Sequence, residues 1–454
     1  MGKVKINPNL THLLLKMFGG ENMERSPYLL FLKSAKNSNY WIYQTLFRKI
    51  TEVNKSVFFS VLENRIETLS QTIKTDLRKN EILVDNPETH WKIYAFYFYK
   101  TKFYPTTPGV VIVPGFGCNL RCTYCYQGIY PKSSEPMNED VLNELIRYLK
   151  GLDNLKIGFY GGEPTVFENH LIKILDSLDS EKVKSISLIT NGVNLSNRLI
   201  DSLSKFENVL LQITFAGDKK THDRLRPMVG GGGSFEKIYN NLRKVLEKGK
   251  FTVLVRIDVC EDNYESIPLL LEKLKEFRNH IKVGFEKVLP PHVIPCDYKI
   301  SVIDDEKISY LFSLARALGF KFPIGEKGDL PLFSFCAALT VNSITINPKG
   351  EVYKCMGFAD LHHMKCGELS KKGIIWNENY FNWMSRDPLK MEGCKECPVL
   401  PLCNGGCAME AFHRYGTIHA KGCDDWKGYV KKIIVPYLIS KYSLPEDLSM
   451  KVSE

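Results

Sequence analysis

The sequence predicts an α/β protein with a central parallel sheet and a smaller module at each end. Between residue 108 and about residue 320, apolar strand-like runs alternate with amphipathic helical runs, which is the pattern of parallel strands joined by crossover helices. Three cysteines lie directly after the first of these strands, and eight more lie between residues 336 and 423. At 454 residues the chain has room for about three domains.

Six strand–helix units follow one another in the central region. The expected strands are 110–113, 156–160, 185–189, 209–215, 252–259 and 281–285. The expected helices are 139–150, 167–178, 197–205, 235–248, 266–277 and 305–318. Since parallel strands end at the same edge of a sheet, we expect the residues that follow them to lie close together.

Residues 1–104 are predicted to form a separate, aromatic-rich α+β module. We expect strands at 28–32 and 40–43, a helix over 57–77 and a short strand at 82–84. Two interpretations stay open: the module packs on the rest of the chain, or it recognises a substrate. We assign 105–320 to the central domain, 321–433 to a cysteine-rich domain and 434–454 to a C-terminal tail.

The central motif is Cys118, Cys122 and Cys125, at C-x3-C-x2-C spacing after a Gly-Phe-Gly turn. A loop this short lets three sulfurs converge on a soft metal centre. A tetrahedral zinc site would need a fourth ligand. A [4Fe–4S] cluster is usually held by four thiolates, so three would leave one iron open.

This spacing, with Tyr124 before the third cysteine, resembles the radical S-adenosylmethionine (SAM) enzymes. The resemblance implies that the open iron chelates SAM and that reductive cleavage of SAM yields a 5′-deoxyadenosyl radical. It also implies a partial (β/α)6 barrel with its active site at the C-terminal ends of the strands.

Further motifs after the strands match that family and imply contacts with SAM. They are Gly161-Gly162-Glu163-Pro164, Asn191 within Thr190-Asn191-Gly192, Thr214 and Arg226. The family usually has S-x-D-G where this chain has Thr214-Phe215-Ala216-Gly217, so the carboxylate is missing at Ala216. No residue is assigned a catalytic role.

The last third of the chain resembles the SPASM extension, which holds two auxiliary iron–sulfur clusters. The resemblance implies an outer cluster on Cys394, Cys397, Cys403 and Cys423, and an inner cluster on Cys336, Cys355 and Cys407. Paired cysteines also form four-thiolate zinc sites, but seven spaced thiols exceed what one zinc needs. The expected cofactors are therefore SAM and three [4Fe–4S] clusters.

Two departures from the family concern the inner cluster. Members with a fully ligated inner cluster carry one more cysteine near Asn342, so this cluster is expected to keep an open iron. Sulfatase maturases have a proton-accepting Asp where this chain has Met356. Cys366 is interpreted as a core residue rather than a ligand, and Cys260 and Cys296 as buried thiols.

These features favour a peptide maturase that forms a crosslink, such as a thioether, in a ribosomally made precursor captured by residues 1–104. The alternatives are a formylglycine-forming maturase, which Met356 disfavours, an RNA- or cofactor-modifying radical enzyme, and a zinc-binding interaction protein. The net charge of +10 is scattered and does not indicate a nucleic-acid partner. We expect a cytoplasmic protein without membrane contact, reduced by a donor such as flavodoxin or ferredoxin.

Overall fold

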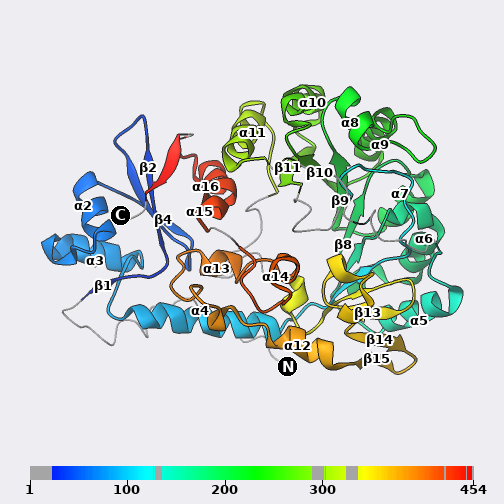
Figure 1. The fold of residues 1–454 in the computed structure, drawn as a ribbon, viewed down its shortest axis with the longest axis horizontal. Helices are drawn as coiled ribbons and strands as arrows, with labels where there is room; N and C mark the ends of the chain where they lie inside the picture. Colours follow the sequence, from blue (N-terminus) through cyan, green and yellow to red (C-terminus); the bar gives the residue numbers. More distant parts are fainter. Residues whose placement is uncertain are drawn as a thin grey trace.

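The computed structural model describes residues 23–125, 127, 135–288, 301, 303–323, 336–423, 426–445 and 447–451 (Figure 1). Cys296 lies outside these ranges. Within them, no helix is long and apolar enough to cross a bilayer.

The predicted parallel sheet is present, with its strands side by side in chain order. It contains β6 (Gly109–Ile112), β7 (Leu155–Phe159), β8 (Val183–Thr190), β9 (Val209–Phe215), β10 (Thr252–Val259) and β11 (Ile281–Lys287). The crossover helices are α5 (Glu139–Lys150), α6 (Glu168–Ser177), α7 (Asn197–Leu203), α9 (Phe235–Lys248), α10 (Ile267–Leu274) and α11 (Asp305–Ala317). The fold class is therefore confirmed. One short helix, α8 (Lys219–Leu225), was not predicted.

The cysteine-rich domain continues this sheet. Strand β12 (Ser343–Ile346) pairs in parallel with β6, and β13 (Glu351–Tyr353), β14 (Gly367–Ser370) and β15 (Gly373–Trp376) follow as an antiparallel extension. The pairing of Ser343 with Gly109 is close, because a Cβ at Gly109 would lie 2.9 Å from the Ser343 hydroxyl. The segment that begins at Cys336 is thereby fixed beside the first barrel strand.

The N-terminal module is built on a four-stranded antiparallel sheet in the order β16-β2-β3-β4. Strands β2 (Leu29–Ser34) and β3 (Tyr40–Gln44) confirm two predicted strands, and β4 (Lys49–Val53) is additional. Alternate side chains of these strands point to opposite faces of the sheet and form two apolar layers. Phe31 and Ile42 pack on helix α2 (Lys55–Leu62), while Trp41 and Tyr43 pack on helix α16 (Val435–Tyr442). Both faces of this sheet are therefore buried.

The prediction of one continuous helix over 57–77 is wrong, because the segment forms two helices with a turn between them. Helix α2 ends at Leu62, and Asn64 adopts a left-handed conformation with φ of 57°. Helix α3 (Gln71–Lys79) starts anew at Ser70, whose hydroxyl accepts the Ile73 N–H. The apolar periodicity continues across this turn, so a prediction from periodicity alone gave a single helix.

The segment expected to be a separate C-terminal tail instead completes the N-terminal sheet. Its strand β16 (Leu448–Lys451) pairs antiparallel with β2, so that Lys451 lies opposite Phe31. Figure 1 shows this C-terminal strand beside the first strands of the chain. Helix α4 (Pro87–Phe103), which was not predicted from the sequence, lies below α13 (Leu400–Cys403) of the cysteine-rich domain in the view of Figure 1.

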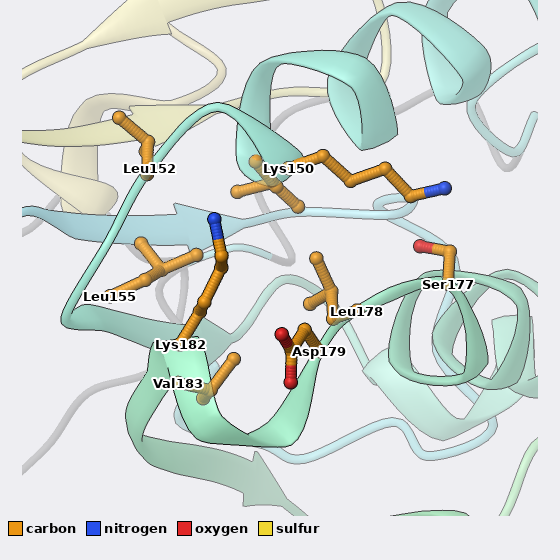
Figure 2. Close-up of a pocket in the computed structure, with 9 residues that line it drawn as sticks. Lys150, Leu152, Leu155, Ser177, Leu178, Asp179, Lys182 and Val183 are labelled. Carbon is orange, nitrogen blue, oxygen red and sulfur yellow. The ribbon is translucent and has the colours of Figure 1, made fainter.

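A cavity of about 170 Å³ lies at the far end of the barrel, where the strands begin. Its lining includes Leu155, the first residue of β7, and Val183, the first residue of β8. Figure 2 shows Lys150, Lys182 and Asp179 around the opening. Since the motif residues follow the opposite strand ends, this cavity is not the candidate site.

Candidate functional site

The predicted SAM-binding motifs all lie at the C-terminal edge of the parallel sheet. The cysteine loop follows β6, Gly161 follows β7, Asn191 follows β8, and Ala216 follows β9. This edge is where parallel α/β barrels carry their active sites.

The cysteine loop is fixed by main-chain hydrogen bonds to the segment after α8. The Arg121 N–H donates to the Pro227 carbonyl at 2.8 Å, and the Thr123 N–H donates to the Leu225 carbonyl at 2.9 Å. Leu120 also forms an antiparallel bridge with Met228. Cys118, Cys122 and Cys125 are half-buried, so burial raises the pKa of the Cys118 thiol to about 12. Iron binding would deprotonate such thiols.

The two glycines after β7 let the cysteine loop approach their backbone closely. A Cβ at Gly162 would lie 2.3 Å from the Phe116 carbonyl oxygen, and one at Gly161 would lie 2.7 Å from the Gly115 oxygen. Gly161 also has a φ of 140°, a backbone conformation that residues other than glycine rarely adopt. The absence of side chains at Gly161 and Gly162 therefore lets this segment pack directly against the 115–117 turn that leads into the cysteine loop.

Glu163 is fully buried and accepts hydrogen bonds from both neighbouring motifs. Its Oε1 accepts the Thr165 N–H at 3.0 Å and the hydroxyls of Thr165 and Thr190 at 2.7 Å, while Oε2 accepts the Asn191 N–H at 2.6 Å. Burial raises the pKa of the Glu163 carboxyl, and these hydrogen bonds oppose the increase. The carboxylate therefore ties the end of β7 to the end of β8, with Pro164 starting the turn that follows.

Asn191 connects that network to the cysteine loop. Its Nδ2 donates to Oδ1 of Asn119 at 2.7 Å and lies 3.9 Å from the Cys118 sulfur. The Nδ2 of Asn119 is buried without a hydrogen-bond partner among the described residues. An unpaired buried donor next to a thiol fits a site that receives a polar group on binding its cofactor.

Arg226 is a buried cation beside the cysteines. Its Nη1 donates to the Tyr124 hydroxyl at 3.2 Å and lies 3.8 Å from the Asp258 carboxylate, whereas its Nε has no partner in the described part of the chain. Burial alone lowers the pKa of Arg226, but Cys122, Tyr124 and Asp258 raise it more strongly. A fixed positive charge near Cys122 fits an anionic iron–sulfur cluster.

Thr214 lies at the end of β9, directly opposite Arg256 on β10. The Arg256 Nε pairs with Asp258 at 2.7 Å, which brings two arginines to one carboxylate. Ala216 takes part through its backbone, because its N–H donates to Nδ1 of His222 at 3.2 Å. Sequence reasoning missed Asp258 and Arg256, although a charged pair at the end of an apolar strand was a usable signal.

The outer set of thiols, Cys394, Cys397, Cys403 and Cys423, gathers in one place. Burial and, to a smaller extent, the charges of the other three thiols raise the pKa of Cys403 to about 12, so the four thiols are neighbours. Helix α13 ends at Cys403, where Asn404 turns the chain with a left-handed φ of 50°.

The inner set, Cys336, Cys355 and Cys407, gathers separately. Burial raises the pKa of Cys355, and Cys336 and Cys407 raise it further, so the three thiols are neighbours. In the described ranges no three Cys, His, Asp or Glu side chains are arranged to hold a single metal ion. A [4Fe–4S] cluster is held differently, because each thiolate binds a different iron.

Comparison with known proteins identifies the class of enzyme. Residues 112–278 match the Radical SAM superfamily, and residues 336–398 match SPASM, an iron–sulfur cluster-binding domain. The protein is a radical SAM enzyme with a SPASM domain. It therefore binds SAM and iron–sulfur clusters.

The similarity to individual known proteins extends over most of the chain. The radical SAM cyclopropyl synthase TigE of Paramaledivibacter caminithermalis is 23% identical over 70% of this chain and 72% of its own. A cysteine-type anaerobic sulfatase-maturating enzyme of Clostridium novyi is 25% identical over 70% of this chain and 92% of its own. The solved structure of Streptococcus suis SuiB bound to precursor peptide SuiA shares the fold, with a TM-score of 0.53 and 17% identity over 89% of this chain and 99% of that one.

Proposed function

We propose that this enzyme is a peptide maturase that forms a thioether crosslink in a ribosomally made precursor. The observation that carries the proposal is the inner set of three neighbouring thiols, Cys336, Cys355 and Cys407. Cys336 and Cys407 are exposed, and Cys355 is half-buried. With three protein thiolates, a [4Fe–4S] cluster would present one open iron to a substrate thiolate.

Cys366 is the nearest candidate for a fourth ligand along the described chain, and its surroundings hold it in the core. Its side chain is fully buried against Tyr353 and Trp383, and its thiol donates to the Met364 carbonyl at 3.5 Å. Its N–H donates to the Val352 carbonyl at 2.7 Å, and its own carbonyl accepts the Asn377 N–H. A rotation of the Cys366 side chain toward the inner set would break the thiol's hydrogen bond, and a movement of its backbone would break the two main-chain hydrogen bonds.

The residue after Cys355 argues against formylglycine formation. A maturase of that type needs a proton acceptor there, but Met356 has an exposed thioether that cannot take a proton. An iron-bound thiolate needs no such base, because coordination already removes its proton. Met356 is therefore compatible with a substrate cysteine bound to iron.

The similar proteins support a peptide or protein substrate, since one is a sulfatase-maturating enzyme and SuiB binds the precursor peptide SuiA. Joining a carbon to a cysteine sulfur removes two hydrogen atoms from the peptide. One of them leaves as a hydrogen atom, which becomes part of 5′-deoxyadenosine. The other leaves as the thiol proton, released to solvent, and an electron, for which an auxiliary cluster would be the acceptor when bound. A reducing cytosol with a flavodoxin or ferredoxin donor would supply the electron that cleaves SAM.

The roles of the SAM-site residues follow from their positions. Gly161, Gly162 and Pro164 shape the turn, Glu163 and Asn191 join it to the cysteine loop, and Tyr124, Thr214 and Arg226 line the neighbouring strand ends. We propose that this group binds the methionine and adenosine parts of SAM. Cys118, Cys122 and Cys125 would hold the cluster that cleaves it, and the two auxiliary sets would hold two more.

The N-terminal module offers one way to capture a leader peptide. Both faces of its sheet are covered, and among the described residues β4 pairs with β3 alone. Lys49 and Glu52 on this edge strand are exposed. An extended peptide could add a strand to such an edge through main-chain hydrogen bonds.

The test is reaction with a short cysteine-containing peptide encoded beside the gene for this enzyme. Anaerobic enzyme, SAM and dithionite should yield 5′-deoxyadenosine and a peptide lighter by two hydrogen atoms. This product should have one fewer thiol that reacts with an alkylating reagent. Conversion of that cysteine to an aldehyde would instead support the sulfatase-type alternative. Iron near zero with stoichiometric zinc would refute both.

A further inference from the structure

The two auxiliary thiol sets share one buried cation, Arg386. It follows helix α12 (Glu378–Ser385), and its side chain is fully buried. Among the described residues it has no ion-pair partner, and its Nε has no hydrogen-bond partner. Burying a guanidinium without a carboxylate is costly unless another negative group lies nearby.

The guanidinium of Arg386 contacts the backbone that joins the two sets. Its Nη2 donates to the carbonyl oxygens of Gly405 at 3.0 Å and Gly406 at 3.2 Å. These glycines connect Cys403 of the outer set to Cys407 of the inner set. Its Nη1 donates to the Ala420 carbonyl at 2.9 Å, three residues before Cys423 of the outer set. One side chain thus holds segments that carry ligands of both sets.

The contacted segments pack without room for side chains. Gly405 and Gly406 have φ of 83° and 75°, and Gly406 bridges to Gly422. A Cβ at Gly422 would lie 2.1 Å from the Cys407 carbonyl oxygen. The thiol-bearing loops are therefore pressed together at the point where Arg386 bonds to them.

The surroundings of the inner set add further positive charge. The Lys102 ammonium, 1% exposed, donates to the Arg386 carbonyl at 2.6 Å, and the Lys354 ammonium, 3% exposed, donates to the carbonyls of Thr340 and Ser343. Burial lowers the pKa of Arg386, whereas Cys407, Cys336, Cys394 and Cys403 raise it, which places its charge near thiols of both sets.

We propose that Arg386 is a positioning residue shared by both auxiliary clusters, and that its fixed positive charge raises the reduction potential of each. A nearby cation stabilises the more negative, reduced form of a cluster. Charge and hydrogen bonding around the ligands are known ways to tune such potentials. The inference rests on the proposal that both sets hold clusters, but not on the identity of the substrate.

The test compares the full-length Arg386→Gln and Arg386→Lys proteins with the parent and with Lys390→Met, which removes an exposed cation from the same segment. Iron content is measured first, and potentials are then measured by anaerobic redox titration with electron paramagnetic resonance. In Arg386→Gln, both auxiliary potentials should shift to more negative values while the SAM-cleaving cluster keeps its potential. Arg386→Lys should recover most of the shift, and Lys390→Met should match the parent.

Several outcomes would overturn the inference. Unchanged potentials in Arg386→Gln would remove the electrostatic role, and a shift in one auxiliary cluster only would remove the shared role. If Arg386→Gln loses auxiliary iron, Arg386→Lys decides: retained iron and potential support the charge, and equal loss in both variants shows that Arg386 only packs. A parent with about four irons would refute the auxiliary clusters themselves.

Discussion

The hydroxyl of Tyr94, on helix α4, donates a hydrogen bond to Oδ1 of Asn404 at a distance of 3.0 Å. Asn404 directly follows Cys403, a proposed ligand of the outer cluster. Tyr94 also packs with Leu400 and Cys394 in one apolar cluster. The N-terminal module is therefore joined to the outer auxiliary site, so a deletion of residues 1–104 would expose that site as well as remove substrate contacts.

Tyr94→Phe should weaken this junction without disturbing the fold. Loss of one buried hydrogen bond should lower the free energy of unfolding by about 1 kcal/mol. The electron paramagnetic resonance signal of the outer cluster should change, because Asn404 loses a partner beside Cys403. Tyr97→Phe, on the same helix, is the matched control and should leave both quantities unchanged. An unaltered outer-cluster signal in Tyr94→Phe would show that the contact is not transmitted to the cluster.

Glu163→Gln should destabilise the barrel rim. The amide nitrogen must face either the Thr165 N–H or the Asn191 N–H, because each carboxylate oxygen accepts from one of them. Placing two donors together in a buried site should cost about 1–3 kcal/mol in chemical unfolding. Glu247→Gln, on the exposed face of α9, should cost nothing measurable. Full stability of Glu163→Gln would mean that the carboxylate is not needed to join β7 to β8.

His222 should make stability depend on pH. Burial lowers its pKa from 6.5 to about 3, and the neutral ring accepts the Ala216 N–H and bonds to Ser234. Between these pKa values the unfolded chain binds the proton and the folded chain does not, so stability is complete above pH 6.5 and falls as pH falls. At pH 5 the loss should be about 2 kcal/mol. His222→Asn does not titrate in this range, so its unfolding free energy should depend less on pH than that of the parent. Equal pH dependence in both proteins would contradict the assignment.

A proline in β4 should block leader binding if the leader adds a strand at this edge. Successive N–H groups of an edge strand point alternately to the partner strand and to the open side. Ile50→Pro and Thr51→Pro therefore sample both directions, and the variant that keeps the stability of the parent has lost an outward N–H. That variant should bind the precursor about tenfold more weakly by fluorescence anisotropy. Parental affinity in both folded variants would move leader capture to another surface.

The central sheet could be predicted closely because each of its strands buries one face, which places apolar residues at regular positions along it. The run Val209–Phe215 is continuously apolar except at Gln212 and Thr214, and its bounds were predicted without error. Helix α4 was missed, because the aromatic residues Tyr94, Phe96, Tyr97, Phe98 and Tyr99 leave no distinct apolar stripe. Neither the pairing of Met450 with Leu32 nor the burial of Arg386 has a local signal, since both depend on segments far apart in the chain.

The most direct test of the account is the iron content and resonance spectrum of its auxiliary clusters alone. The triple variant Cys118→Ala, Cys122→Ala, Cys125→Ala should be unable to cleave SAM and should hold about eight irons, against about twelve in the parent. Adding Cys366→Ala to it should leave the iron content and the inner-cluster signal unchanged, as should Cys296→Ala. A cysteine-containing precursor should then perturb the inner signal, and its Cys→Ser analogue should perturb it less. Loss of the inner cluster in Cys366→Ala or Cys296→Ala, or a signal indifferent to the peptide, would contradict the open iron on which the proposed thioether chemistry depends.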